Sequence, residues 1–270
     1  MQFHIIKISN HSKTKIKEIQ HLLEEIYSSG KVFDSNNKEY EVGLTSISKK
    51  EGEFIQNIIE SNNITNTIEV GCAYGLSSLF ICLGLSKKYS KHHTIIDPFQ
   101  SSQWNNIGFE NLKKTGVNYF ELIEDYSELA LPKLLKDGKK FDLGFIDGWH
   151  TLDHTLIDFF YINKMLSVNG IIIFDDVTYP SINKLMGYIS QYPSYEVIGT
   201  VEMSYPRREL EKILTFPLKL LSLILPFSVT SRILPGHIAQ KNRQFKLNTS
   251  MIALKKIKED ERSYDWFKQF

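Results

Sequence analysis

The sequence predicts an α/β fold in which a doubly wound sheet of seven strands carries helices on both faces. Between residues 67 and 174, short apolar segments alternate with helical patterns, as in parallel strands joined by helices. Residues 171–174 are apolar without interruption, which is typical of a strand buried on both faces. Two glycines, Gly71 and Gly75, follow the first of these strands, at the edge where such folds bind ligands.

The amino-acid composition limits the classes of protein to which this chain can belong. The chain has 270 residues, of which 42% are hydrophobic and 23% charged, so it can bury a substantial core. The formal net charge of +1 argues against nucleic acid as a main partner. Cys72 and Cys82 have no further Cys or His at metal spacing, and we expect buried thiols in a reducing compartment. The first residues lack a signal-peptide pattern and no apolar run reaches about 18 residues, so a cytoplasmic protein is expected.

Residues 1–62 are predicted to form an N-terminal helical cap. Residues 13–28 carry apolar side chains at helical spacing, and Gly30 ends that pattern. Residues 34–42 are polar and are expected to form a loop. Ser46 or Ser48 can cap a second helix over residues 49–61, whose first turn is acidic.

Residues 63–202 are predicted to form the ligand-binding core, and residues 248–270 the last strand and the C-terminal tail. The expected strands cover residues 67–70, 92–97, 119–123, 141–147, 171–174, 195–201 and 250–257. Thr151 can cap the helix after the fourth strand, and Asn169-Gly170 is expected to close it.

Several polar residues stand where predicted strands end. The spacing Gly-x-x-x-Gly from Gly71 to Gly75 lacks the dinucleotide fingerprint but suits a nucleotide-like ligand at a helix N-terminus. An ordinary glycine loop is the alternative. Asp97, which ends the second strand, can accept both hydroxyls of a ribose; because Pro98 follows, a turn aspartate is the alternative. Side chains in the loop after the third strand can meet an adenine edge.

Three carboxylates are expected to converge at the tips of the fourth and fifth strands. Asp147, Asp175 and Asp176 lie there, and their mutual repulsion calls for a cation or for protonation. Oxygen ligands favour Mg²⁺, which can lower the pKa of an acceptor hydroxyl. We therefore expect this cluster to hold a metal or an acceptor.

An acid in the first strand followed by Gly-x-x-x-Gly resembles motif I of the class I S-adenosylmethionine-dependent methyltransferases, whose core is Rossmann-like. The gap from Asp147 to Asp175 is similar to that in the catechol-type, metal-dependent O-methyltransferases. The pattern from residue 97 through 147–150 to 175–176 resembles a bacterial branch of small methyltransferases with mostly undefined acceptors. The resemblance covers roughly residues 43–200 and implies S-adenosylmethionine as cofactor, bound by Glu69, Gly71, Gly75, Ser77, Asp97, Tyr126, Ser127 and Trp149.

His150 departs from the catechol-type pattern, which has lysine at that position. Imidazole can act as a general base at neutral pH, so His150 and Asp147 are the candidate catalytic residues. The alternative is a histidine that only bonds to Asp147 or the cofactor. His150 and His154 share a helix face, but without the Glu of a His-Glu-x-x-His motif a zinc site is disfavoured.

The resulting hypothesis is O-methylation of a small hydroxylated acceptor, such as a sugar or glycolipid precursor. A metal-dependent hydroxylase-like or purely ligand-binding protein on the same scaffold is the alternative. Residues 203–247 form a basic, apolar insertion with eight Lys and Arg against two Glu. It is expected either to pack as a lid or homodimer contact or to lie on an anionic membrane surface.

Overall fold

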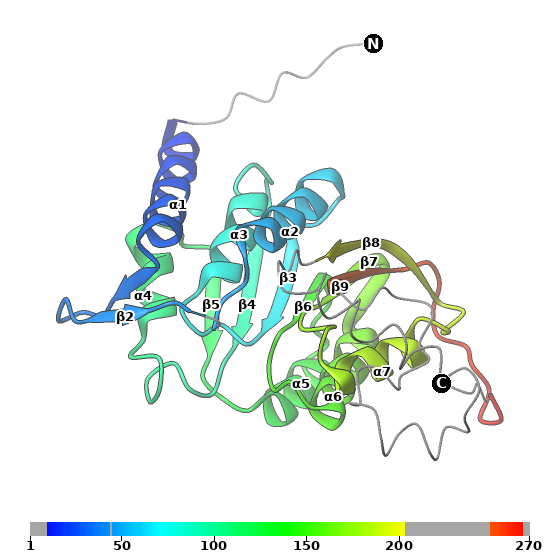
Figure 1. The fold of residues 1–270 in the computed structure, drawn as a ribbon. Helices are drawn as coiled ribbons and strands as arrows, with labels where there is room; N and C mark the ends of the chain where they lie inside the picture. The colour runs from blue at the N-terminus through cyan, green and yellow to red at the C-terminus, as the bar shows by residue number, and fades with distance from the viewer. Residues whose placement is uncertain (1–9, 44, 203–248, 267–270) are drawn as a thin grey trace, which may run out of the picture.

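A single seven-stranded sheet organises the molecule (Figure 1), and the computed structural model describes residues 10–43, 45–202 and 249–266. The strand order is β5-β4-β3-β6-β7-β9-β8. Strands β3 to β7 are parallel, whereas β9 is antiparallel to both of its neighbours. The strands are β3 Asn66–Val70, β4 His92–Ile96, β5 Phe120–Ile123, β6 Phe141–Ile146, β7 Leu166–Phe174, β8 Tyr195–Glu202 and β9 Thr249–Lys256.

Helices cover both faces of the sheet and form two apolar cores (Figure 1). One face carries α1 Asn10–Ser29, α2 Lys49–Ser61, α3 Leu76–Leu85 and α4 Ile107–Lys114. The other carries α5 Ser127–Lys136, α6 Leu152–Met165 and α7 Pro180–Ile189. In β3, Ile68 and Val70 join the core beneath α5 and α6, so the alternation along the strand turns Glu69 toward α3. The predicted fold class is confirmed.

The N-terminal region contains a second, small sheet. Strands β1 Lys31–Phe33 and β2 Glu39–Glu41 pair antiparallel, and β2 lies within residues 34–42, where a loop was expected. Asp34 Oδ1 closes the turn by accepting from the backbone N–H groups of Asn36 and Lys38, at 2.8 and 2.9 Å. Helix α2 has the predicted cap, because Ser48 and Glu51 form a reciprocal capping box.

The predicted end of the helix after β6 is wrong. Helix α6 ends at Met165, and β7 already begins at Leu166, which pairs with Phe141. A register shift follows in this pairing, and Asn169 adopts a positive φ of 71° inside the strand. The Asn-Gly pair that resembled a helix cap is therefore an irregularity of β7.

Two further expectations concern membranes and the insertion. Within the part of the chain that the structure describes, no helix is long and apolar enough to cross a membrane. The predicted insertion, residues 203–247, lies outside the described residues.

Candidate active site

The loop between β3 and α3 passes directly against the tip of β6. Gly71 has a φ of +91°, and a Cβ atom there would lie 2.1 Å from the backbone oxygen of Asp147. Gly75 has a φ of +83° and precedes α3, where a Cβ would lie 2.9 Å from the backbone oxygen of Gly108. Both predicted glycines are thus required by backbone conformation and by close approach, whatever else the loop binds.

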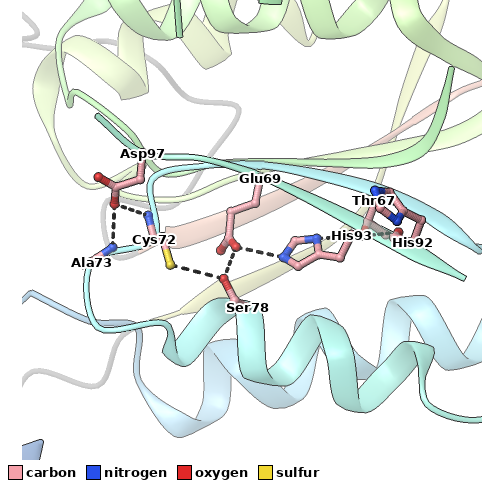
Figure 2. Close-up of polar contacts among 8 residues, drawn as sticks. All are labelled: Thr67, Glu69, Cys72, Ala73, Ser78, His92, His93 and Asp97. Atoms are coloured by element: carbon pink, nitrogen blue, oxygen red, sulfur yellow. Dashed lines mark hydrogen bonds and ion pairs between the residues drawn. The ribbon is translucent and has the colours of Figure 1, made fainter. Parts of the chain in front are cut away.

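Asp97 holds this loop in place from the end of β4. Its side chain is buried, and Oδ2 accepts from the backbone N–H groups of Cys72 and Ala73 at 3.0 and 2.9 Å (Figure 2). Oδ2 also accepts from Gln100, and Oδ1 accepts from the N–H of Phe99. A carboxylate oxygen has about two lone pairs, so unused acceptor capacity remains mainly on Oδ1. The bidentate contact of Asp97 with a ribose stays a prediction. The alternative role, that of an aspartate that bonds to the backbone of a turn, is present in the structure.

The expected contact between Glu69 and the cofactor needs correction. Glu69 is 0% exposed, and its side chain points from β3 toward α3, as Figure 2 shows. Its Oε2 atom accepts from the Ser78 hydroxyl and lies 3.1 Å from His93 Nε2. Ser77, in the first turn of α3, is also buried. Sequence spacing could place Glu69 near the loop but could not say which face of β3 carries its side chain.

Aromatic rings gather at the ends of β4, β5 and β6. The ring centroid of Phe99 lies 5.9 Å from that of Tyr126 and 6.0 Å from that of Trp149. Tyr126 and Trp149 are exposed, so their faces are open to a flat ligand. Phe99 was missed as a site residue; its position two residues after Asp97, in the same strand-end loop, was the available signal.

Ser127 begins α5 beside this aromatic group. Its hydroxyl interacts with the carboxyl of Asp158, which comes from α6 and is almost fully buried. Burial raises the pKa of Asp158 to about 6, against the lowering effect of the Ser127 hydrogen bond. The predicted adenine contact of Ser127 stays a prediction, and its hydroxyl already has one partner.

Two carboxylates and an imidazole meet at the tips of β6 and β7. Asp147, His150 and Asp176 each offer a ligand atom, and these atoms lie within 4.8 Å of one another. His150 Nδ1 is 2.8 Å from Asp176 Oδ2. His150 stands in this group beside two of the three predicted aspartates, and the charge of the third, Asp175, also acts on Asp147. The mixed nitrogen and oxygen donors suit a first-row transition ion better than Mg²⁺, which prefers oxygen ligands alone.

Burial and crowding of negative charge act on this group. Desolvation raises the pKa of Asp147 well above its usual range, and the Asp175 and Asp176 carboxylates add to that effect. Burial likewise raises the pKa of Asp175, with Glu51 as the next largest contribution. Glu51 belongs to the capping box of α2 and was predicted only as a first-turn acid. The N-terminal helices therefore bring a further carboxyl toward the strand tips.

Tyr179 is another residue that sequence reasoning missed. Its ring centroid lies 5.6 Å from that of His150, and the backbone oxygen of His150 accepts from Ser181 at 3.2 Å. Both partners come from the start of α7, a helix for which no motif was identified. His150 is thus contacted by the start of α7 as well as by Asp176 in the loop after β7.

Comparisons with known proteins point to one family. Residues 68–177 match a family model described as a methyltransferase domain. Two Arabidopsis thaliana proteins are similar in sequence: one provisionally named a caffeoyl-CoA O-methyltransferase, 31% identical over 133 residues, and Tapetum-specific methyltransferase 1, 32% identical over 130 residues. Each alignment covers 47% of this chain and 52% of the relative, so the chain spans about half the length of the curated relatives it matches.

A solved structure shares the fold over a longer stretch. The O-methyltransferase from Bacillus cereus, solved in complex with S-adenosylhomocysteine, aligns with a TM-score of 0.55 and 15% identity. The alignment covers 74% of this chain and 87% of that protein. At this identity the likeness establishes the fold alone.

Proposed function

Because residues 68–177 are a domain of the class I S-adenosylmethionine-dependent methyltransferases, we propose that this chain methylates a hydroxyl group of a small molecule. The acceptor oxygen attacks the methyl carbon as the bond from that carbon to sulfur breaks. The products are a methyl ether and S-adenosylhomocysteine, and one proton must leave the acceptor. The protein therefore has two tasks, to align the reactants and to receive that proton.

The observation that carries the proposal is the pairing of His150 with Asp176 at the strand tips. The 2.8 Å contact lets Nδ1–H donate to the carboxylate, which leaves Nε2 free to accept a proton. The negative carboxylate also stabilises the imidazolium that forms. Asp147 lies in the same group, where its carboxyl can orient an acceptor hydroxyl.

The residues around the glycine loop support S-adenosylmethionine as the cofactor. Support comes from the position of the glycine loop at the strand ends, from the exposed faces of Tyr126 and Trp149, and from the remaining acceptor capacity of Asp97. Ser77 and Ser127 lie at the starts of α3 and α5, beside these groups. Glu69 is left out of this set because it is enclosed beneath α3.

The proposed reaction, with His150 as the base, does not require a metal ion. Mg²⁺ was predicted on Asp147, Asp175 and Asp176; the converging atoms would instead hold an ion through Asp147, Asp176 and a nitrogen of His150. Such an ion would stabilise negative charge on the acceptor oxygen. An imidazole bound to an ion is not available as a base, so the two roles of His150 exclude one another.

The test is transfer of a labelled methyl group from S-adenosylmethionine to a panel of small hydroxylated compounds, sugars and catechols included, with and without EDTA. We expect transfer that survives EDTA and is lost in His150→Ala. His154→Ala is the control, because His154 lies one turn along α6 outside the converging group. Binding of S-adenosylhomocysteine without any transfer would favour the alternative of a ligand-binding or hydroxylase-like protein.

Narrower expectations rest on the sequence alone. A sugar or glycolipid precursor as acceptor, a cytoplasmic location, and a membrane or homodimer contact through residues 203–247 all stay predictions. The panel of acceptors addresses the first of these directly.

A further inference from the structure

A chain of buried polar side chains extends from the glycine loop between the sheet and α3 (Figure 2). Thr67, Glu69, Ser78 and His93 are each 0% exposed. His93 Nδ1 lies 2.9 Å from Thr67 Oγ1, and His93 Nε2 lies 3.1 Å from Glu69 Oε2, which also accepts from the Ser78 hydroxyl. The chain thus links β3, β4 and the first turn of α3.

Burying this chain of polar side chains costs free energy. It interrupts the apolar core on the α3 face, where a buried carboxylate loses its hydration. Glu69 Oε1 finds no hydrogen-bond partner among the described residues, which adds to the cost. Apolar side chains at these positions would fill the same space without that penalty, so packing alone does not account for the chain.

The chain ends on the glycine loop. Cys72 Sγ lies 3.6 Å from Ser78 Oγ, while the backbone N–H of Cys72 donates to Asp97. The next residue, Ala73, has a positive φ of 46°, a conformation that a residue with a side chain adopts only when its surroundings impose it. Asp97 therefore holds the backbone of Cys72, and Ser78 contacts its thiol.

We propose that Glu69, Ser78 and His93 form a positioning set that fixes the Cys72–Ala73 part of the loop and contact no ligand themselves. Ser78 is the link: its hydroxyl joins the carboxylate to the loop thiol, and His93 anchors the carboxylate to β4. The inference rests on the proposed function only in assuming that the loop binds S-adenosylmethionine. The order of the loop can be measured without that assumption.

The experiment is amide hydrogen exchange in the ligand-free protein, read at Cys72 and Ala73, whose N–H groups are protected by Asp97. We expect Ser78→Ala and His93→Gln each to raise exchange there by roughly 3- to 12-fold, the equivalent of one lost hydrogen bond. Exchange in the β7 core should not change. An equal rise in both places, or no rise at the loop, would overturn the proposal.

Matched controls are available on the same elements. Ser86→Ala removes a buried hydroxyl that bonds to the Leu83 carbonyl at the other end of α3. His92→Gln changes the neighbouring histidine, which pairs with Glu121 at the surface. Neither should affect exchange at the loop. In the double variant of Ser78 and His93, we expect the exchange rate at the loop to rise by less than the product of the two single increases. A rise equal to that product would show that the two residues act separately.

Calorimetry with S-adenosylhomocysteine on the same variants separates this inference from the proposed function. We expect Kd to rise with the loop exchange in Ser78→Ala and His93→Gln. If the wild type binds no ligand but the loop exchange responds, the proposed function fails and the positioning set stands. If the ligand binds and neither quantity responds to the variants, the positioning set fails alone.

Discussion

The closest backbone approach in the candidate site yields a sharp prediction about Gly71. In Gly71→Ala the new Cβ would lie 2.1 Å from the Asp147 backbone oxygen and 2.7 Å from its carbonyl carbon. Real Cβ atoms do not come so close, and the obstacle is backbone, which cannot rotate away. Either the glycine loop or the turn after β6 must therefore move.

The cost has two parts that a control can separate. A residue with a side chain at a φ of +91° loses about 1–2 kcal/mol, because the left-handed region is unfavourable for it. Overpacking against the β6 turn costs a further 1–3 kcal/mol, as is typical of a forced backbone shift. Gly138→Ala is the control, because Gly138 has a φ of +72° but its Cβ would meet nothing within 4 Å.

Denaturant unfolding of the wild type, Gly71→Ala and Gly138→Ala measures the backbone cost and the overpacking cost. We expect the free energy of unfolding to fall by about 1–2 kcal/mol in Gly138→Ala and by about 2–5 kcal/mol in Gly71→Ala. Gly71→Ala should also weaken S-adenosylhomocysteine binding, whereas Gly138→Ala should not. Equal destabilisation by the two substitutions would refute the close approach of the loop to β6.

Three further predictions concern the site. Trp149→Ala should raise the Kd for S-adenosylhomocysteine by an amount equivalent to about 1–3 kcal/mol, the range for a lost base–aromatic stack, as read by calorimetry; an unchanged Kd would remove Trp149 from the adenine site. His150→Ala should abolish methyl transfer while leaving that Kd within about twofold, because in the proposed reaction the pair with Asp176 serves proton transfer and not cofactor binding; lost binding would refute the base role. The pKa of Asp158 is about 6 in the folded protein and 3.8 in the unfolded chain, so the folded state binds this proton more tightly. The free energy of unfolding should therefore fall as pH rises from about 4 to 6, by about 3 kcal/mol for this group. Unfolding measured across that range should show a shallower fall in Asp158→Asn, and an unchanged slope would contradict the assignment.

Much of the fold could be predicted because its signals are local. The unbroken apolar run ending at Phe174 and the glycines at 71 and 75 mark strand and turn without reference to other parts of the chain. The end of α6 could not be found in this way. Asn169 and Gly170 carry the chemistry of a helix cap, but pairing of Leu166 with Phe141 draws those residues into β7. Tertiary pairing decided between two locally acceptable structures.

The candidate site could be located but not resolved in detail. Topology alone brings the ends of β6 and β7 together, which placed Asp147 and Asp176 near each other. Which side chains converge depends on backbone conformation beyond spacing: Asp176 has a positive φ of 54°, and its carboxylate meets His150. Glu69 shows the same limit, because strand alternation places it in the core and not at the ligand edge.

The central claim is that the edge formed by the glycine loop, the aromatic group and the His150–Asp176 pair binds the methyl donor. Titration of S-adenosylhomocysteine into the full chain in a calorimeter tests it most directly. We expect saturable heat at one site per chain, weakened in Trp149→Ala and retained in His150→Ala. No heat from the folded wild type at millimolar ligand would contradict it.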